Sequence, residues 1–228
     1  QIGLSDWYAG AFDIGFFNQL AGNAAADTRV AANNTPTAPT GATTYFANGV
    51  ANETAVAADA ASNVMQIKFI DYALQKAKLN TPCVRPIKDQ GEEYYVMFLH
   101  PYQVTALRTN VGVGQWLDIQ KAAMTGGEIT KNPIFTGALG MYNNVILHES
   151  TRVPSVVANS YRSMLCGAQA GILAFGQDSS GNKVSWVEEL FDYGNQLGVA
   201  AGMIWGGKKA IFNGQDFAVI TVITSGLA

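Results

Sequence analysis

The order in which helix and strand patterns follow one another restricts the fold of this chain more than any other feature of its sequence. Two segments with helical character, residues 4–21 and 60–79, lie within the first 80 residues. β-forming residues dominate the later part, where residues 217–224 (FAVITVIT) form the strongest β segment. A few early helices followed by many strands predict an α+β fold rather than an alternating βαβ fold.

The first helical segment, residues 4–21, carries a broad surface of large apolar side chains, and Gly22 suits the position that ends a helix. We expect its aromatic residues to lie in a core or an interface rather than around a ligand. They are Trp7, Tyr8, Phe12, Phe16 and Phe17. The helix starts almost at residue 1 with little room for a start signal, so we expect the natural protein to hold more sequence upstream.

The second segment, residues 60–79, has the clearest helical periodicity in the chain. Its apolar residues recur at spacings of three and four, at Val64, Ile67, Ile70, Leu74 and Ala77. Asp59 suits the N-cap, and the sequence 80–82 (NTP) stops the helix. The pattern therefore predicts one helix over residues 60–79.

The remaining segments give shorter elements. Residues 23–58 are rich in Ala, Asn, Thr, Gly and Pro, which predicts a long surface loop with a short hairpin near residues 44–46. Residues 94–99 read as a strand buried on both faces. We also expect short helices at 102–108 and 115–124, and strands at 145–147, 163–175, 185–193 and 198–212.

The composition favours a subunit of an assembly. Charged residues make up 14% of the 228 residues and glycine occurs 24 times, so much of the surface is expected to be covered by other subunits. The net charge is −3 and no basic run exceeds Lys208-Lys209, which disfavours a nucleic-acid binder. The longest apolar run, residues 94–99, is too short to span a membrane.

Histidine occurs only twice in the chain. His100 and His148 each end an expected strand, and Glu149 follows the second. Two histidines and a carboxylate could bind zinc, but neither histidine has a partner at a short metal-ligand spacing. Strand-end histidines that hydrogen-bond a loop are the favoured interpretation.

Two glycine-containing segments resemble phosphate loops only in part. The sequence 112–116 (GVGQW) lacks the third glycine of a dinucleotide loop, and 206–209 (GGKK) is followed by Ala210 instead of Ser or Thr. Both are therefore expected to be turns, the second with solvated lysines.

Cysteines and paired carboxylates give no active site either. Cys83 and Cys166 are expected to be buried thiols rather than a disulfide, although a pair of Cys166 with a histidine stays open. Glu92-Glu93 and Glu188-Glu189 are neighbours on expected strands, so the two side chains of each pair point to opposite faces. They are expected to be solvated or in ion pairs between subunits.

Several longer stretches are similar to one family. The sequence YYVMFLHPYQ (94–103), followed by GQWLDIQKAA and NPIFTGALGMYNNVILHES, resembles the phage major capsid proteins called the N4 gp56 family. The opening helix ending in DIGFFNQLAG and the tail 184–226 also look like theirs. The resemblance covers nearly the whole chain, most firmly 94–152 and 184–226, and residues 23–58 are its variable part.

This resemblance implies the HK97-like capsid fold, with an axial domain and a peripheral domain that holds a spine helix and a long sheet. Residues 1–22 would be the C-terminal end of the spine helix, residues 23–183 the axial domain including the long loop 23–58, and residues 184–228 strands of the peripheral domain. The family's N-terminal arm and extended loop would lie before Gln1, so this N-terminal part is expected to be absent from the chain.

The resemblance also implies a structural role and no enzyme activity. The chain would be a major capsid protein subunit that self-assembles, as hexamers and pentamers, into the icosahedral head shell of a phage or prophage. Packaged double-stranded DNA would contact it only by non-specific proximity, and scaffold, portal and decoration proteins are further candidate partners. No catalytic, cofactor-binding or metal residue, no cofactor and no membrane are implied. The protein would be assembled in the bacterial host cytoplasm and reside in the virion.

Two other classes of function stay open at this point. A carbohydrate- or ligand-binding module of a phage or surface protein would use the glycine-rich late strands, and it would need a sandwich. A metal-dependent hydrolase would need His100, His148 and Glu149 to converge within a few ångströms. The fold of residues 60–152 discriminates best between these functions. A wedge-shaped α/β domain preceded by a long helix would favour the capsid subunit.

Overall fold

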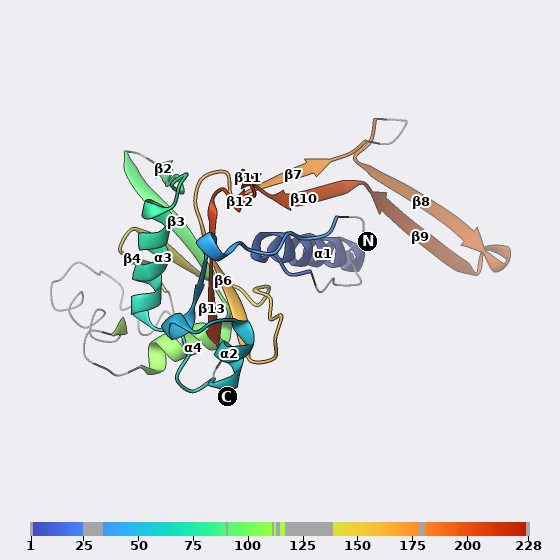
Figure 1. The fold of residues 1–228 in the computed structure, drawn as a ribbon. Coiled ribbons are helices and arrows are strands. Elements are labelled where there is room, and N and C mark those ends of the chain that lie inside the picture. Colours follow the sequence, from blue (N-terminus) through green and yellow to red (C-terminus); the bar gives the residue numbers. More distant parts are fainter. Residues whose placement is uncertain are drawn as a thin grey trace.

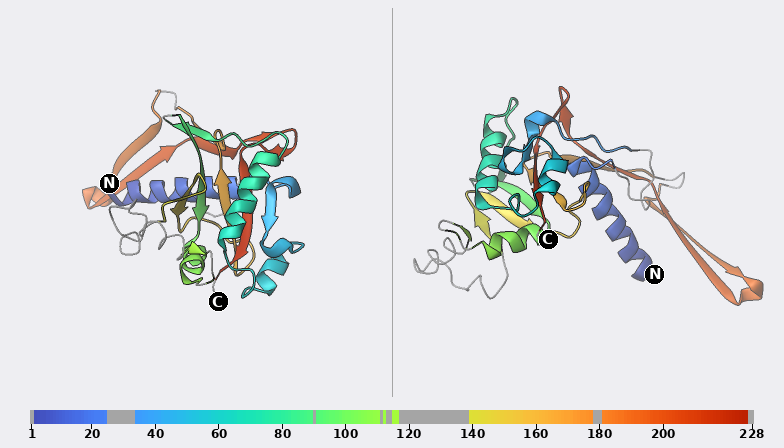
Figure 2. Two further views of the ribbon diagram at one scale, coloured as in Figure 1. Left: turned by 90° about the vertical axis from the view of Figure 1, so that its left-hand side faces the viewer. Right: turned by 60° about the horizontal axis from the view of Figure 1, so that its bottom comes forward.

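The computed structural model describes residues 2–24, 34–89, 91–110, 112, 115–116, 139–177 and 181–226. A compact body surrounds one mixed sheet, and helix α1 (Ile2–Ala21) and a long β-hairpin project from it (Figures 1 and 2). The other helices are η1 (Gly41–Thr43), η2 (Ala47–Gly49), α2 (Glu53–Ala58), α3 (Ile67–Leu79), α4 (Pro101–Thr109) and η3 (Asp192–Gly194). Among the described residues, no helix has both the length and the apolar character needed to cross a membrane.

The body is built on a seven-stranded sheet of order β1-β13-β6-β3-β5-β4, in which β2 also pairs with β3. β13 runs parallel to β1 and antiparallel to β6, while β3 runs antiparallel to β6 and parallel to β5. The strands of this sheet are β1 (Thr44–Phe46), β2 (Ile87–Asp89), β3 (Glu92–Leu99), β4 (Met141–Tyr142), β5 (Val145–Glu149), β6 (Ser160–Cys166) and β13 (Val219–Ser225). This arrangement confirms the predicted α+β class.

β13 explains why residues 217–224 carry the strongest β pattern. All seven residues of the strand are buried, because helices cover both faces of the sheet. Ile220 and Val222 pack in the core that α3 closes with Phe69, whereas Val219 packs on the other face. There, the end of α1 inserts Leu20. A strand buried on both sides needs apolar residues at nearly every position.

α3 begins later than the periodicity predicted. The helix covers Ile67–Leu79 with Gln66 as N-cap, so the expected start at residue 60 is wrong. The Asp59 carboxylate closes a turn by accepting from the Ser62 backbone, and the Asn63 carbonyl accepts from the Ser225 N–H at 2.9 Å. Residues 60–66 therefore cross the end of β13, and this contact outweighs the local helical preference.

The loop expected over residues 23–58 is also partly ordered into elements. Residues 44–46 form strand β1, but it pairs in parallel with β13 instead of forming a hairpin. Residues 53–58 form α2, whose N-cap Asn52 accepts a hydrogen bond from the Ala55 N–H at 2.9 Å. The sequence pattern did not indicate this helix, because Val56 is its one buried apolar residue.

α4 follows β3 with the expected proline in its first turn. The His100 ring accepts from the Tyr102 N–H at 3.3 Å, and Gln103 Oε1 accepts from the His100 N–H at 2.8 Å, which together cap the helix. β3 is longer than expected. Its buried residues, Tyr95, Met97 and Leu99, alternate with half-buried Val96 and Phe98. The strand is thus fully buried on the α3 face only, not on both faces as expected.

The segment predicted as one strand or a strand pair over 163–175 consists of two strands, β6 and β7 (Gly171–Phe175), which lie in different sheets. The chain turns between them at residues 168–169, just after Gly167, where an added Cβ would lie 2.3 Å from the Arg85 carbonyl oxygen. At Gly171 an added Cβ would lie 2.8 Å from the Phe16 ring. Both glycines therefore serve the close backbone approach that their positions suggested.

The later strands leave the body. β7 pairs with β10 (Trp205–Lys209), and β8 (Val184–Phe191) pairs with β9 (Gln196–Met203) in a separate ladder. β11 (Ile211–Phe212) and β12 (Gln215–Asp216) form a small hairpin that returns the chain to the body. β13 then lies in the seven-stranded sheet, not beside β8 and β9. β13 therefore shares its sheet with β1 to β6.

Candidate assembly surface

The β8–β9 hairpin, residues 184–203, forms a protruding arm (Figure 1). Its strands pair over eight residues each, every residue of β8 is exposed, and β9 is exposed or half-buried throughout. The large apolar residues exposed along it are Val184, Trp186, Val187, Leu190, Phe191, Tyr193, Leu197 and Val199. A two-stranded hairpin is at best marginally stable in water, so such an apolar arm needs a cover.

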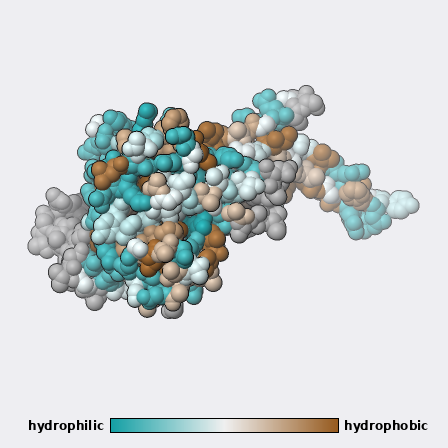
Figure 3. All heavy atoms as spheres, viewed as in Figure 1, coloured by the Kyte–Doolittle hydropathy of each residue, from teal (hydrophilic) through white to brown (hydrophobic). Residues whose placement is uncertain are grey.

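The two faces of the arm differ in chemistry. The register pairs Trp186 with Ala201 and Leu190 with Leu197, which places these side chains on one face. We call this face the arm stripe, and it consists of Val184, Trp186, Glu188, Leu190, Leu197, Val199, Ala201 and Met203. Its one carboxylate, Glu188, accepts a hydrogen bond from Trp186 Nε1 at 2.8 Å. Figure 3 shows hydrophobic residues along the arm, interrupted by hydrophilic ones.

A groove of about 400 Å³ separates the base of the arm stripe from the N-terminal half of α1. The Tyr8 hydroxyl donates to the Ala201 carbonyl across it. The other residues that line it are largely apolar: Leu4, Ser5, Ala9, Phe12, Val184, Trp186 and Met203. Beyond the helix the stripe continues uncovered, with Leu190 65% and Leu197 63% exposed.

Aromatic contacts fix the base of the arm on α1. The Phe12 ring lies edge-on to the Trp205 ring, with centroids 4.6 Å apart, and to the Phe175 ring at 6.0 Å. Asn34 Nδ2 donates to the Gly207 carbonyl at 2.6 Å. These contacts couple the direction of the arm to the direction of the helix.

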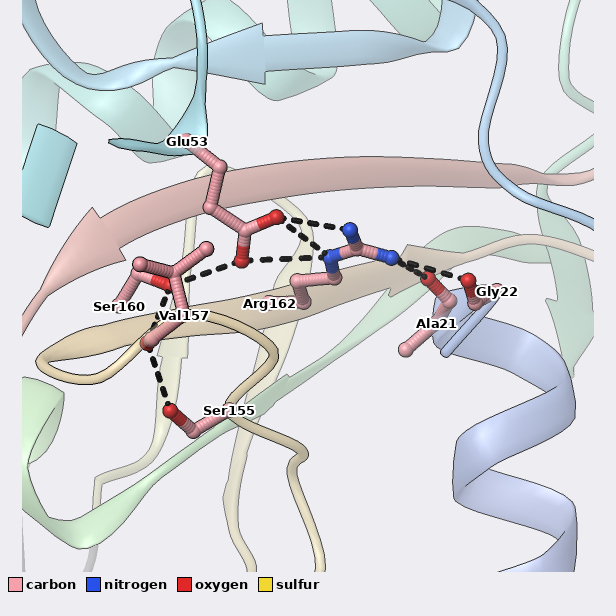
Figure 4. Close-up of polar contacts among 7 residues, drawn as sticks. All are labelled: Ala21, Gly22, Glu53, Ser155, Val157, Ser160 and Arg162. Atoms are coloured by element: carbon pink, nitrogen blue, oxygen red, sulfur yellow. Dashed lines mark hydrogen bonds and ion pairs between the residues drawn. The ribbon is translucent and has the colours of Figure 1, made fainter. Parts of the chain in front are cut away.

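The C-terminal end of α1 is anchored to the sheet by Arg162 of β6 (Figure 4). Its Nη1 donates to the Ala21 and Gly22 carbonyls at 3.2 and 2.9 Å. Its Nη2 lies 2.7 Å from Oε2 of Glu53, whose Oε1 accepts from Ser160 Oγ at 2.8 Å. A cation at the carbonyl end of a helix interacts favourably with the helix dipole. Arg162 thus joins α1, α2 and the sheet.

A second buried ion pair fixes the return from the arm. Lys209 Nζ lies 2.7 Å from Asp216 Oδ1, both side chains are 1% exposed, and Thr43 donates to Asp216 Oδ2 at 2.8 Å. Burial lowers the pKa of Lys209, and the Asp216 carboxylate opposes this change. The sequence 206–209 was expected to be a turn with solvated lysines, and this expectation is wrong for Lys209. It lies in β10 because the strand pairs with β7.

The histidines take structural positions. His100 caps α4 and stacks on Tyr161 with ring centroids 4.2 Å apart. Burial lowers its pKa, against the opposing effect of Glu149. His148 is exposed on β5 beside the Phe98 ring, with centroids 5.6 Å apart. Within the described ranges, which include both histidines and Glu149, no three such groups come close enough to hold a metal ion.

The cysteines and glutamates differ in part from expectation. Cys83 and Cys166 are free thiols, and burial raises the pKa of Cys166 to about 12. Cys83 is exposed, so its expected burial is wrong. Glu188 and Glu189 lie on opposite faces of the arm, as strand geometry predicted. Glu93 pairs with Lys88 at 2.9 Å on the neighbouring strand.

Two expectations fall wholly or partly outside the described residues. They are the helix over 115–124, of which 117–124 are not described, and the segment 112–116, in which 113 and 114 are not described.

The two alternative functions, a carbohydrate-binding module and a metal-dependent hydrolase, lose support. The described part of residues 60–152 forms helices around a sheet instead of the sandwich that a carbohydrate-binding module would need.

Sequence reasoning missed three features that shape this surface: the arm stripe, the Arg162–Glu53 pair and the Lys209–Asp216 pair. Alternation along β8 is a usable signal for the stripe, because Val184, Trp186 and Leu190 share a parity. The Arg162–Glu53 pair joins residues more than 100 positions apart, and the Lys209–Asp216 pair joins residues on either side of the turn into the β11–β12 hairpin. No local spacing reports such pairs.

Comparisons with known proteins agree with this architecture. The capsid of Ralstonia phage GP4 is 30% identical and superposes with a TM-score of 0.75, covering 99% of this chain and 66% of that one. The capsid of cyanophage Pam1 is 19% identical with a TM-score of 0.70, covering 96% of this chain and 65% of that one. The capsid of Helicobacter pylori bacteriophage KHP30 has a TM-score of 0.64 at 16% identity, with 98% and 67% covered. These likenesses confirm the HK97-like capsid fold.

Sequence comparisons point to the same family. The major capsid protein of Pseudomonas phage KPP25 is 29% identical over 195 residues, which are 75% of this chain and 49% of that protein. The chain thus spans about half the length of this relative and about two thirds of the solved capsid chains. The phage capsid protein family matches residues 1–226. The match extends over both the body and the arm, and the chain belongs to the phage capsid protein family.

Proposed function

We propose that this chain is the shell-forming part of a phage major capsid protein, and that its copies assemble through the arm and α1 into the head shell. The exposed apolar arm carries this proposal. Its eight-residue strands cover no part of the described body, and an exposed apolar surface of this kind is typical of a site that contacts another molecule. The family membership supports a copy of the same chain as that molecule.

The proposed role assigns one task to each part of the chain. The body around the seven-stranded sheet would be the axial domain, and α1 with the arm would be the peripheral domain. Residues 1–22 keep their proposed role as the end of the spine helix. The position of β13 in the sheet favours a peripheral segment that ends before residue 219.

The assembly would be a structural one. Copies would group as hexamers and pentamers, assemble in the bacterial host cytoplasm and reside in the virion, with no catalytic step. The surrounded genome, a scaffold, a portal and decoration proteins would be contacts of the completed shell. Each contact between copies can be weak, because an icosahedral shell repeats it many times.

The arm residues allow a direct test. Burying Leu190 and Leu197, now about two thirds exposed, would contribute about 1–2 kcal/mol each to a contact. Leu190→Ser with Leu197→Ser should abolish shells in electron micrographs of the full-length protein, while the circular dichroism spectrum stays unchanged. Met141→Ser is the matched control, because Met141 is 55% exposed on β4, away from the arm.

Shells from the control and none from the arm variant would support the proposal. Shells of normal yield from the arm variant would contradict the role of the arm, and monomers of the unaltered protein under all assembly conditions would contradict the function itself.

A further inference from the structure

The arm has an open edge as well as two faces, and the proposed function leaves open what pairs with that edge. We infer that β8 pairs in antiparallel with β8 of a second copy about a two-fold axis, so that two arms join into one four-stranded ribbon. This inference rests on the proposed function and adds the edge, the partner and the register.

β8 has a pairing strand on one side only. The β8–β9 ladder is a separate two-stranded sheet, so each strand has one edge without a pairing strand in the described part of the chain. α1 lies beside β9, where the Tyr8 hydroxyl donates to the Ala201 carbonyl, whereas β8 lies on the side of the arm away from α1 (Figure 1). Every residue of β8 is exposed. Its outer N–H and C=O groups are therefore open to another strand along the arm.

β8 lacks the features that prevent pairing at an exposed edge. Proteins protect such edges with proline, lysine or a bulge, or they keep the edge strand very short. β8 is eight residues long, its sequence VSWVEELF contains neither proline nor lysine, and its register with β9 is continuous from Val184 to Phe191. A two-stranded hairpin is also only marginally stable in water, and further strands stabilise it. The edge of β8 thus has the properties of a strand that pairs in an assembly.

The charges of β8 select the register with the second copy. In an antiparallel pair about a two-fold axis, one residue lies opposite itself and defines the register. A centre at Glu188 or Glu189 would place a carboxylate opposite its own copy, and like charges directly opposite each other are destabilising. A centre at Val187 avoids this. It pairs residues 184–190 of the two copies, which is the largest overlap that the strand allows without opposed carboxylates.

The register centred on Val187 also gives compatible neighbours on the face of the arm stripe. Val184, 45% exposed, lies opposite Leu190 of the second copy, which is 65% exposed, so pairing covers apolar surface on both. Trp186 lies opposite Glu188 of the second copy. Within one chain the Glu188 carboxylate already accepts a hydrogen bond from Trp186 Nε1 at 2.8 Å, so these two side chains are chemically compatible.

The other face of the ribbon brings opposite charges together. Val187, 58% exposed, contacts its own copy across the axis. Ser185 lies opposite Glu189 of the second copy, and exposed Lys183 lies diagonally opposite the same carboxylate. Glu189 therefore faces a small hydroxyl side chain and a cation instead of its own copy. Complementary charges of this kind fix the register of a contact.

A two-fold contact between arms is compatible with the proposed shell. The axis is perpendicular to the ribbon, so the arm stripes of both copies lie on one face. An isologous contact uses the same surface of each copy and closes after two copies, and two-fold axes are among the symmetry axes of an icosahedral shell. The pairing would thus join copies two by two, and other surfaces would build the hexamers and pentamers.

Disulfide trapping in the assembled full-length protein tests the register. Val187→Cys should form disulfide-linked dimers under oxidised glutathione, because opposite residues of antiparallel strands have Cα atoms about 4.5–5.5 Å apart, within disulfide range. Cys83 is replaced by Ser in every variant, since it is an exposed native thiol. Electrophoresis without reductant measures the dimer. Electron microscopy and thermal melting of the reduced protein confirm that each variant assembles and is folded.

The paired positions supply matched controls. Ser185→Cys and Glu189→Cys should each give little dimer alone, because each residue lies about 13 Å along the ribbon from its own copy. Combined in one chain, the two substitutions should give dimers, because each cysteine then lies opposite the other. Tyr193→Cys, at the fully exposed tip, should also give little dimer, because the two tips lie at opposite ends of the ribbon.

Dimers from Val187→Cys and from the combined variant, with little from the controls, would support the pairing. Shells of Val187→Cys without dimers, or dimers from Tyr193→Cys instead, would overturn the pairing alone. Slow amide exchange at every residue of β8 in the unassembled protein would also overturn it, because the edge would then be paired within one copy. Failure of the unaltered protein to assemble would overturn the proposed function and the pairing with it.

Discussion

Arg162 gives the most informative single perturbation of the fold, because it holds α1 to the body. Its guanidinium makes two hydrogen bonds to helix-end carbonyls and an ion pair with Glu53, and the two side chains of the pair are 12% and 10% exposed. Arg162→Met leaves the Glu53 carboxylate buried with Ser160 as its remaining described donor. Removing one partner of a buried pair costs about 3–5 kcal/mol, and the slight exposure places this case near 3–4 kcal/mol.

Equilibrium unfolding in urea measures this cost on the unassembled protein. For a chain of this length, a loss of 3–4 kcal/mol should lower Tm by roughly 10 °C. The double variant Arg162→Met with Glu53→Gln should be about as stable as Arg162→Met alone, because the buried charge is then gone. The two single costs should thus exceed the double cost by about 2 kcal/mol.

Two results would refute this reasoning. A loss below about 1 kcal/mol for Arg162→Met would mean that solvent replaces the guanidinium at little cost. Additive costs of the two single variants would mean that Arg162 and Glu53 do not act as a pair. Hydrogen exchange at the end of α1 should rise in Arg162→Met if the helix end is released.

Three further predictions concern other contacts. Gly167→Ala should destabilise the protein by about 2 kcal/mol or more in urea unfolding, because the new Cβ would lie 2.3 Å from the Arg85 carbonyl oxygen; a neutral result would contradict the close approach. Lys209→Met should lower the free energy of unfolding by about 3–5 kcal/mol, because it leaves the buried Asp216 carboxylate without its cation. Adding Asp216→Leu should recover much of this loss, and a further loss would argue against the pair. Burial lowers the pKa of His100 below 6.5, so the unfolded chain binds the proton first; His100 therefore contributes stability that is present above pH 6.5 and is lost as the pH falls through its folded-state pKa. His100→Asn keeps an acceptor at the helix cap and should show a flatter dependence of Tm between about pH 7 and pH 5, and an unchanged slope would exclude His100 as the source.

The sequence predicted those parts of the fold that local pattern determines. The apolar run before residue 225 became β13, Pro101 opened α4, and the aromatic segment after residue 1 became α1. Each depends on neighbours in sequence, such as a fixed φ at proline or apolar residues at successive strand positions. The resemblance to phage capsid proteins supplied the overall fold, which these local patterns alone left open.

The candidate site was less predictable, because it depends on pairing between distant residues. The start of α3 moved to residue 67 because Asn63 binds the end of β13, more than 150 residues later. Lys209 is buried because Asp216 and Thr43 meet it there. The two strands of the arm were predictable from their sequence. Their exposure was not, because it depends on their separation from the seven-stranded sheet. A low charged fraction had indicated covered surface without locating it.

Electron microscopy of the full-length protein, with the arm intact and with Leu190→Ser and Leu197→Ser, tests the central claim most directly. The account predicts closed shells or capsomers from the intact protein, and folded subunits without shells from the arm variant. Shells that form equally well from both proteins would contradict it.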